Sequence, residues 1–148
     1  MESIELLLVE DSIFDAELTI RALQKHKLAN KLHHVKDGEE ALQFLNGEGA
    51  YTDRDINQLP KLILLDLKLP KVTGIDVLQE IRNNPRTQKI PVVVLTSSKE
   101  DYDIQKCYEY GVSSYIVKPV DFNKFMDAVA EIGYYWMFLN EPPTENQN

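Results

Sequence analysis

Acidic, hydroxyl and amino side chains follow four short apolar runs in this chain. The first run is followed by Glu10 and Asp11, and the second by Asp66. The third is followed by Thr96 and the fourth by Lys118. In order, the runs are Ile4 to Val9, Leu62 to Leu65, Val92 to Leu95 and Tyr115 to Val117. If their ends meet, three carboxylates, a hydroxyl and an ammonium lie together, and this combination is suited to hold a phosphoryl group with a divalent cation.

The four runs have the character of buried parallel strands. They are short, rich in Val, Ile and Leu, and separated by segments with helical periodicity. A weaker run from Leu32 to Val35 adds a fifth strand. Between the strands, Ser12 is a potential helix N-cap, and Val77, Leu78 and Ile81 follow a helical spacing. Strict alternation predicts a parallel sheet with helices on both faces, and the ligand site of such a sheet lies at the carboxyl ends of its strands.

Composition limits the classes of function. The chain has 148 residues, which corresponds to one domain, and its formal net charge of -8 argues against binding to nucleic acid. Cys107 is the single cysteine, so an internal disulfide is impossible, as expected in a reducing compartment. The N-terminus lacks a positively charged signal region, and no apolar run reaches membrane-spanning length. We expect a cytoplasmic protein with no membrane contact, in which residues 1–140 form the domain and residues 141–148 a disordered tail.

The motifs at the strand ends resemble those of a known family. Taken together and in this order, they are similar to the receiver domain of two-component response regulators from about Ile4 to Phe138. They are Val9-Glu10-Asp11-Ser12, Leu65-Asp66-Leu67-Lys68-Leu69-Pro70 with Gly74, Val94-Leu95-Thr96-Ser97, and Tyr115-Ile116-Val117-Lys118-Pro119. The resemblance implies an α/β fold of the flavodoxin-like, doubly wound type, with a five-stranded parallel sheet in the order 2-1-3-4-5.

The resemblance also implies roles for individual residues. Asp66 would be the nucleophile that accepts a phosphoryl group from a sensor histidine kinase. Mg²⁺ would be held by Glu10, Asp11 and Asp66, together with the backbone carbonyl of Lys68. The protein would then be a signalling switch rather than an enzyme, and it would act by changing its affinity for a partner or for itself.

Three further residues take roles from the same resemblance. Lys118 would pair with a phosphoryl oxygen, and Thr96 would donate its hydroxyl to another. Tyr115 would turn inward when the Thr96 hydroxyl is recruited, which makes these two residues the switch. The long loop from Gly47 to Pro60 and the aromatic C-terminal extension resemble the single-domain regulators that partner bacterial phytochrome histidine kinases.

Two other functions use a similar sheet. A Mg²⁺-dependent phosphohydrolase of the haloacid dehalogenase type would need a second acid two residues after Asp66, where this chain has Lys68. A flavin-binding module would need a phosphate-binding loop after the first strand, where Glu10 and Asp11 would repel the cofactor phosphate. Both alternatives are therefore disfavoured by charge.

The last predicted helix is apolar around most of its circumference. Ile132, Trp136 and Leu139 can continue its core-facing stripe. The predicted interface is made of four aromatic residues, Tyr134, Tyr135, Trp136 and Phe138. A helix that is apolar all round is expected to be buried on more than one side. We expect a homodimer through this helix, and the alternative is an extension that folds back over its own domain.

Overall fold

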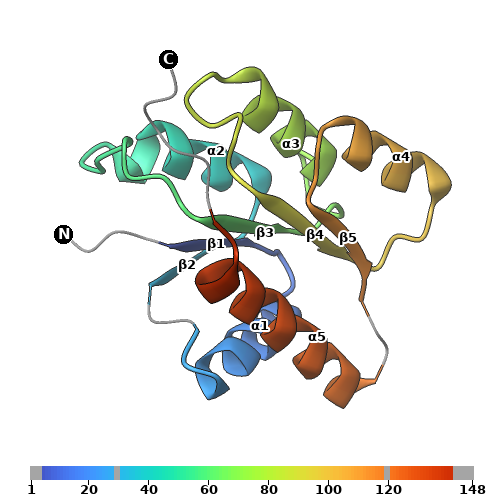
Figure 1. Cartoon of the computed structure of the whole chain (residues 1–148). Coiled ribbons are helices and arrows are strands. Elements are labelled where there is room, and N and C mark those ends of the chain that lie inside the picture. Colours follow the sequence, from blue (N-terminus) through green and yellow to red (C-terminus); the bar gives the residue numbers. More distant parts are fainter. Residues whose placement is uncertain (1–4, 29–30, 119–120, 142–148) are drawn as a thin grey trace.

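The structure is a computed structural model that describes residues 5–28, 31–118 and 121–141, without the side chains of Phe122 and Met137. Strands and helices alternate along the chain (Figure 1). The strands are β1 (Leu6–Val9), β2 (Leu32–Val35), β3 (Leu62–Leu65), β4 (Val92–Thr96) and β5 (Ser114–Val117). The helices are α1 (Ile13–Lys25), α2 (Gly38–Asn46), α3 (Gly74–Asn83), α4 (Asp101–Glu109) and α5 (Phe122–Tyr134). A 3-10 turn, η1 (Gly49–Tyr51), and a π-helical segment, η2 (Tyr135–Leu139), complete the set.

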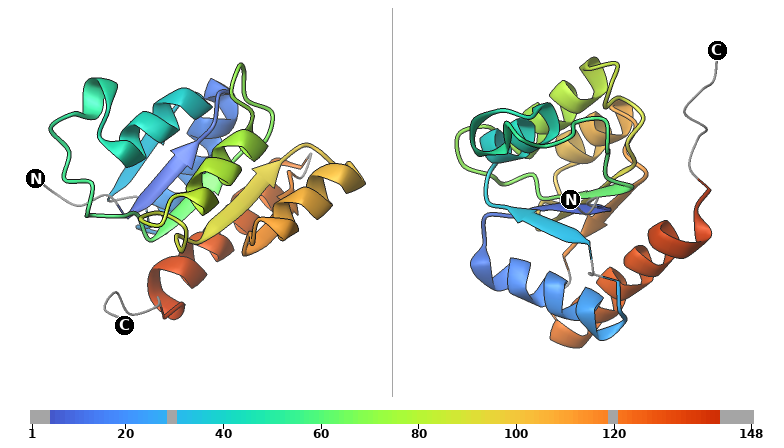
Figure 2. Two further views of the ribbon diagram at one scale, coloured as in Figure 1. Left: turned by 90° about the horizontal axis from the view of Figure 1, so that it is seen from above. Right: turned by 90° about the vertical axis from the view of Figure 1, so that its left-hand side faces the viewer.

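The five strands form one parallel sheet in the order β2-β1-β3-β4-β5, which confirms the predicted fold class. Successive residues of a strand point to opposite faces of a sheet. Leu7 and Val9 accordingly join the core beneath α2, α3 and α4, whereas Leu6 and Leu8 join the core beneath α1 and α5. Figures 1 and 2 show these two helical layers on either side of the sheet. Both faces are covered, and the central strands β1 and β3 are accordingly continuous apolar runs.

Side-chain caps start α1 and α3, the helices that follow β1 and β3. Ser12 accepts a hydrogen bond from the Asp15 amide at the start of α1, as predicted. Thr73 and Asp76 form a reciprocal capping box at the start of α3. These caps bind backbone N–H groups that have no partner inside the helix, and so they fix where each helix begins. The acidic loop residues between strand and helix are thereby held at the sheet edge.

The segment from 47 to 60 is a loop as predicted, although it contains the short turn η1. Two arginines fasten it to neighbouring backbone. Arg54 donates from Nε to the Phe44 carbonyl at 2.8 Å, and Arg86 donates from Nη1 to the Ile56 carbonyl at 2.9 Å. The loop is therefore attached on the side of α2, away from the carboxyl ends of the strands.

The C-terminal helix packs against α1 and continues into η2. Trp136 is half-buried against the core beneath α1 and α5. Leu139 is 59% exposed, so the prediction that it continues the core stripe was wrong. The hydrogen bonds of η2 join residues five apart, such as the Asn140 amide and the Tyr135 carbonyl. This wider turn changes the angular spacing of side chains, so a stripe extrapolated at 3.6 residues per turn no longer applies. Of the predicted tail, residues 142–148 lie outside the described part of the chain.

Candidate functional site

Strand register brings the polar residues of four strands to one edge of the sheet. Val9 is level with Leu65, so the residues that follow them, Glu10 and Asp66, are neighbours. Thr96 is level with Val117 and therefore lies beside Lys118 in the next strand. All these residues lie at carboxyl ends, where parallel sheets place their ligand sites. The convergence predicted from the order of the motifs is present in the structure.

The Lys118 ammonium lies at the centre of this edge. Its Nζ donates to Glu10 Oε1 at 2.7 Å, to Asp15 Oδ2 at 2.8 Å and to Asp66 Oδ2 at 3.0 Å. The side chains of Lys118, Glu10 and Asp66 are at most 10% exposed, whereas that of Asp15 is 30% exposed. An ammonium has three N–H donors. Each of them has a carboxylate partner in this site.

Three carboxylates at this edge fit a divalent cation. Glu10, Asp11 and Asp66 each offer an oxygen, and these oxygens lie within 4.8 Å of one another. Asp11 is exposed while the other two are buried, so one side of the trio is open to solvent. Magnesium prefers oxygen ligands and keeps several waters, which this half-open arrangement allows. Coordination by the Lys68 carbonyl remains a prediction.

Among the three carboxylates, the pKa of Glu10 departs furthest from its ordinary value. Burial and the nearby Asp66 charge together raise the pKa of Glu10 to about 7, against the opposing hydrogen bond from Lys118. The Ser12 amide donates to the second oxygen of Glu10 at 3.2 Å. His34 Nε2 lies 2.8 Å from the Glu10 backbone carbonyl. Both the side chain and the backbone of Glu10 are therefore held in place.

The pKa of Asp66 is shifted in the opposite direction. Burial favours its protonated form, but the charge of Lys118 and hydrogen bonding from Thr96, Lys118 and the Lys68 amide outweigh burial and hold the pKa of Asp66 below its ordinary value. The Lys68 amide donates to Asp66 Oδ1 at 3.2 Å. Burial also disfavours the charged form of Lys118, yet its carboxylate partners raise its pKa. An ionised carboxylate next to a permanent ammonium is suited to attack an electrophilic phosphorus centre.

Of the two predicted switch residues, Thr96 is hydrogen-bonded to this carboxylate, and Tyr115 contacts the loop that follows Thr96. Thr96 is fully buried at the end of β4, and its Oγ1 lies 3.4 Å from the Ser98 amide. The Tyr115 hydroxyl donates to the Ser98 carbonyl at 3.0 Å, and burial raises the pKa of this phenol. Ser98 in turn donates to Asp103 in the first turn of α4 at 2.6 Å. One short loop between β4 and α4 thus contacts both residues.

Close packing of α3 holds the loop that follows Asp66. Gly74 begins this helix, and its amide donates to the Leu67 carbonyl at 3.0 Å. A Cβ at position 74 would overlap the Asp66 carbonyl oxygen and lie only 2.5 Å from the Leu67 Cα. Both are backbone atoms and cannot rotate away. Only glycine allows the helix to approach the Asp66 loop this closely.

Two contacts of the site were not predicted from the sequence. Asp15 is a third carboxylate on Lys118, and His34 supports the Glu10 carbonyl. Asp15 lies four residues after Asp11, in the first turn of a helix that starts at this sheet edge, and that position was the available signal. His34 is level with Leu8 in the neighbouring strand, but the direction of its ring is a matter of side-chain conformation.

Comparisons with known proteins give matches of one kind over most of the chain. The family model for the response regulator receiver domain matches residues 6–130. A probable methanogenesis regulatory protein, FilR2 of Methanothrix harundinacea, is 40% identical over 93% of this chain and 86% of its own length. The response regulator Rcp1 of Synechocystis sp. is 39% identical over 89% of this chain and 88% of its own length.

Solved structures agree with these matches. The Mn²⁺-bound form of response regulator Rcp1 superposes with a TM-score of 0.87 at 36% identity, covering 97% of this chain and all of that one. The bacteriophytochrome response regulator RtBRR superposes with a TM-score of 0.76 at 50% identity, covering 96% of this chain and 85% of that one. Each of these two superpositions covers nearly the whole chain.

Proposed function

The chain belongs to the response regulator receiver family, and from this premise we propose that it is a phosphorylation-dependent switch that accepts its phosphoryl group on Asp66. The observation that carries the proposal is the state of this side chain: a nearly buried carboxylate that hydrogen bonds from Lys118 and the Lys68 amide keep ionised. A carboxylate in this state is a competent nucleophile.

The proposed reaction is a transfer between two side chains. A carboxylate oxygen of Asp66 attacks the phosphorus of a phosphohistidine on a sensor kinase. The new O–P bond forms while the P–N bond breaks, and the electron pair of that bond stays on the imidazole nitrogen, which is protonated by solvent. The product is an acyl phosphate on Asp66. Lys118 would shift one of its N–H donors to a phosphoryl oxygen, and Thr96 would donate its hydroxyl to another.

A divalent cation is part of the proposal. Glu10, Asp11 and Asp66, with the Lys68 carbonyl, would hold Mg²⁺, and the relative Rcp1 has been crystallised with Mn²⁺. Such a cation would offset the negative charge that gathers when a phosphoryl group approaches three carboxylates. Without it, Lys118 is the sole cation within hydrogen-bonding distance of Asp66 among the residues that the structure describes.

The likeness to phytochrome regulators supports a phytochrome-type histidine kinase as the partner. The surface beside the acceptor also suits a protein donor. Ile13 and Phe14 lie two and three residues after Asp11 and are 70% and 67% exposed. Exposed apolar side chains at this density mark contact surfaces. We propose that they dock the kinase while its phosphohistidine reaches Asp66.

A hydrolytic function has less support. A phosphohydrolase would need an acid two residues after Asp66, but Lys68 holds that position and its side chain is exposed rather than directed into the site. The acid that does lie against Asp66, Glu10, is bound by Lys118 and belongs to the trio of carboxylates that fits a cation.

Self-association is the proposed output. Tyr134, Tyr135 and Phe138 are each about half exposed or more, and Trp136 is half-buried against its own domain. The chain thus folds back in part, yet this row of aromatic side chains on α5 and η2 keeps about half or more of its surface exposed. We propose that a second copy covers this row in a two-fold symmetric pair.

Phosphotransfer profiling tests the proposal. The protein is mixed briefly with a panel of autophosphorylated histidine kinases, with Mg²⁺ or with a chelator, and the initial loss of label from each kinase is measured. We expect fastest transfer from a phytochrome kinase, and none when the cation is chelated. Phe14→Ala should slow transfer from the kinase while leaving labelling by acetyl phosphate unchanged, with Tyr102→Ala on α4 as the matched control. Equal initial rates of transfer from all kinases would contradict the proposal that a phytochrome-type kinase is the partner.

A further inference from the structure

Asp15 differs from the other two carboxylates that bind Lys118. Glu10 and Asp66 both belong to the trio of oxygens that fits a divalent cation, and Asp15 does not. Asp66 also has the proposed role of phosphoryl acceptor. When cation and phosphoryl group are both present, these two carboxylates have other partners. Asp15 is then the carboxylate that remains for Lys118.

The backbone of Asp15 is fixed on both sides. Its amide donates to Ser12 Oγ at 3.2 Å, and its carbonyl accepts from the buried Thr19 hydroxyl at 2.9 Å. The side chain therefore starts from a rigid helical turn and reaches Lys118 Nζ at 2.8 Å. A charge-assisted bond of this length from a fixed position restricts where the ammonium can lie.

We propose that Asp15 is a positioning residue, which holds the Lys118 ammonium over the acceptor while the cation and the phosphoryl group occupy Glu10 and Asp66. The inference rests on the proposed function and adds one residue to its machinery. Asp15 does not touch the transferred group. It acts through Lys118, and so its effect depends on the presence of that side chain.

The first test is a double-mutant cycle on the initial rate of labelling by acetyl phosphate with Mg²⁺. Asp15→Ala loses one positioned, charge-assisted hydrogen bond, and its initial labelling rate should be about tenfold lower than that of the wild type. Asp15→Asn keeps an acceptor oxygen without the charge and should fall between Asp15→Ala and wild type. Glu17→Ala, which removes an exposed acid from the same helix, should stay within about twofold of wild type. In a Lys118→Ala background, Asp15→Ala should change the rate by less than about twofold.

Two results would overturn the inference. One is an Asp15→Ala rate equal to that of Glu17→Ala. The other is the same slowing by Asp15→Ala whether or not Lys118 is present, because a purely structural effect would not depend on that side chain. Thermal unfolding of each variant identifies a folding defect, and Asp15→Asn then takes the place of Asp15→Ala under the same criteria.

A second measurement separates this inference from the proposed function. In NMR spectra recorded with Mg²⁺, the ammonium hydrogens of Lys118 should exchange slowly with water in the wild type and faster in Asp15→Ala. Unchanged exchange in Asp15→Ala would refute the role of Asp15, even if Asp66 is the acceptor. If the wild type takes no label, the proposal that Asp66 is the phosphoryl acceptor is refuted. The exchange rates of the Lys118 ammonium hydrogens would still decide the role of Asp15.

Discussion

At the scale of single residues, two carboxylates share the Lys118 ammonium but have different pKa values. Glu10 and Asp66 are both nearly buried and both bind Lys118, yet the pKa of Glu10 rises to about 7 and that of Asp66 falls below its ordinary value. The difference follows from their neighbours, since the Lys118 charge and the Thr96 hydroxyl lower the pKa of Asp66, whereas the Asp66 charge raises that of Glu10. Any proton that enters this site therefore goes to Glu10 first. The acceptor stays ionised at neutral pH, as nucleophilic attack requires.

A histidine away from the site gives a testable pH dependence. His33 is stacked on Phe44 with ring centroids 4.7 Å apart, and its Nε2 lies 2.8 Å from the Tyr51 hydroxyl, which donates to Glu40. Burial lowers the pKa of His33. The unfolded chain therefore binds a proton at this residue at higher pH than the folded protein does. This contribution to stability is complete above pH of about 6.5 and is lost as the pH falls through that value.

We predict that His33→Phe weakens the pH dependence of the free energy of unfolding. Urea unfolding of wild type and variant at several values between pH 7.5 and 5.5, at about 0.5 unit spacing, measures the difference. The wild type should lose more stability than the variant over this interval. His26→Gln is the matched control, because His26 is exposed, and it should behave like wild type. Parallel curves for wild type and His33→Phe would show that His33 is not held neutral.

At the scale of helices and strands, most of the fold follows from the sequence. The apolar runs from Leu62 to Leu65 and from Leu32 to Val35 are strands with the predicted bounds. Burial of both sheet faces makes such a run continuous, whereas the order of the strands in the sheet was predicted from the family resemblance. The cluster of polar side chains at the carboxyl ends could also be predicted, because the ends of parallel strands meet at one edge of a sheet.

The remaining features depend on side-chain direction. Asp15 reaches Lys118 because of the angle at which α1 leaves the sheet, and Leu139 is exposed because the helix changes to a π-helical turn. His34 bonds the Glu10 carbonyl through one particular ring orientation. Periodicity gives the face of an element, but not its tilt or the conformation of a polar side chain. These contacts could therefore be found only in three dimensions.

The close approach of α3 to the acceptor loop gives a prediction at this scale. Gly74→Ala should lower the free energy of unfolding by about 1–3 kcal/mol or more, because the added methyl group meets backbone atoms of Asp66 and Leu67. It should also reduce labelling by acetyl phosphate, since relief of the overlap must displace the acceptor loop. Urea unfolding and initial labelling rates measure the two effects. Gln79→Ala on the exposed side of α3 is the control, and equal stability of the two variants would contradict the packing argument.

At the scale of the whole molecule, the uncovered aromatic row predicts a dimer. The rings of Tyr134 and Phe138 are in contact, with centroids 5.5 Å apart, and they are 53% and 64% exposed. Within the described residues no helix has the length and apolar character to cross a membrane, so this row is not part of such a helix. Light scattering across a concentration series should give the mass of a dimer for the wild type and that of a monomer after Tyr134→Ala with Phe138→Ala.

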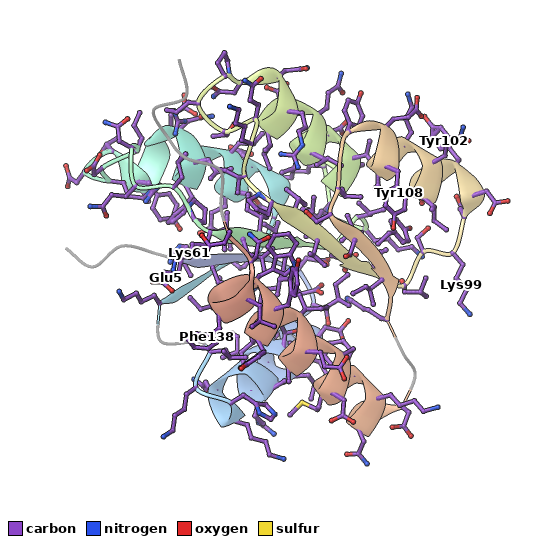
Figure 3. The ribbon with its side chains drawn as sticks, in the orientation of Figure 1. Glu5, Lys61, Lys99, Tyr102, Tyr108 and Phe138 are labelled. Atoms are coloured by element: carbon purple, nitrogen blue, oxygen red, sulfur yellow. The ribbon has the colours of Figure 1, made fainter. Side chains whose placement is uncertain are left out.

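The matched control removes aromatic rings of similar exposure elsewhere. Tyr102 and Tyr108 of α4 are 61% and 52% exposed, and Figure 3 shows them on the opposite side of the view from Phe138. Their double replacement by alanine should leave the dimer intact. A wild type that stays monomeric at every concentration, with and without a phosphoryl mimic, would refute this interface.

The central claim is that Asp66 is the phosphoryl acceptor, and transfer of label from a phosphorylated histidine kinase to Asp66→Asn tests it most directly. The amide has nearly the same shape as the carboxylate, but it cannot form the acyl phosphate. Thermal unfolding should show that the variant keeps its fold. With Mg²⁺ present, the wild type should take the label in a form that is lost in alkali, and Asp66→Asn should take none. Labelling of folded Asp66→Asn at the wild-type level would place the acceptor elsewhere and contradict the account.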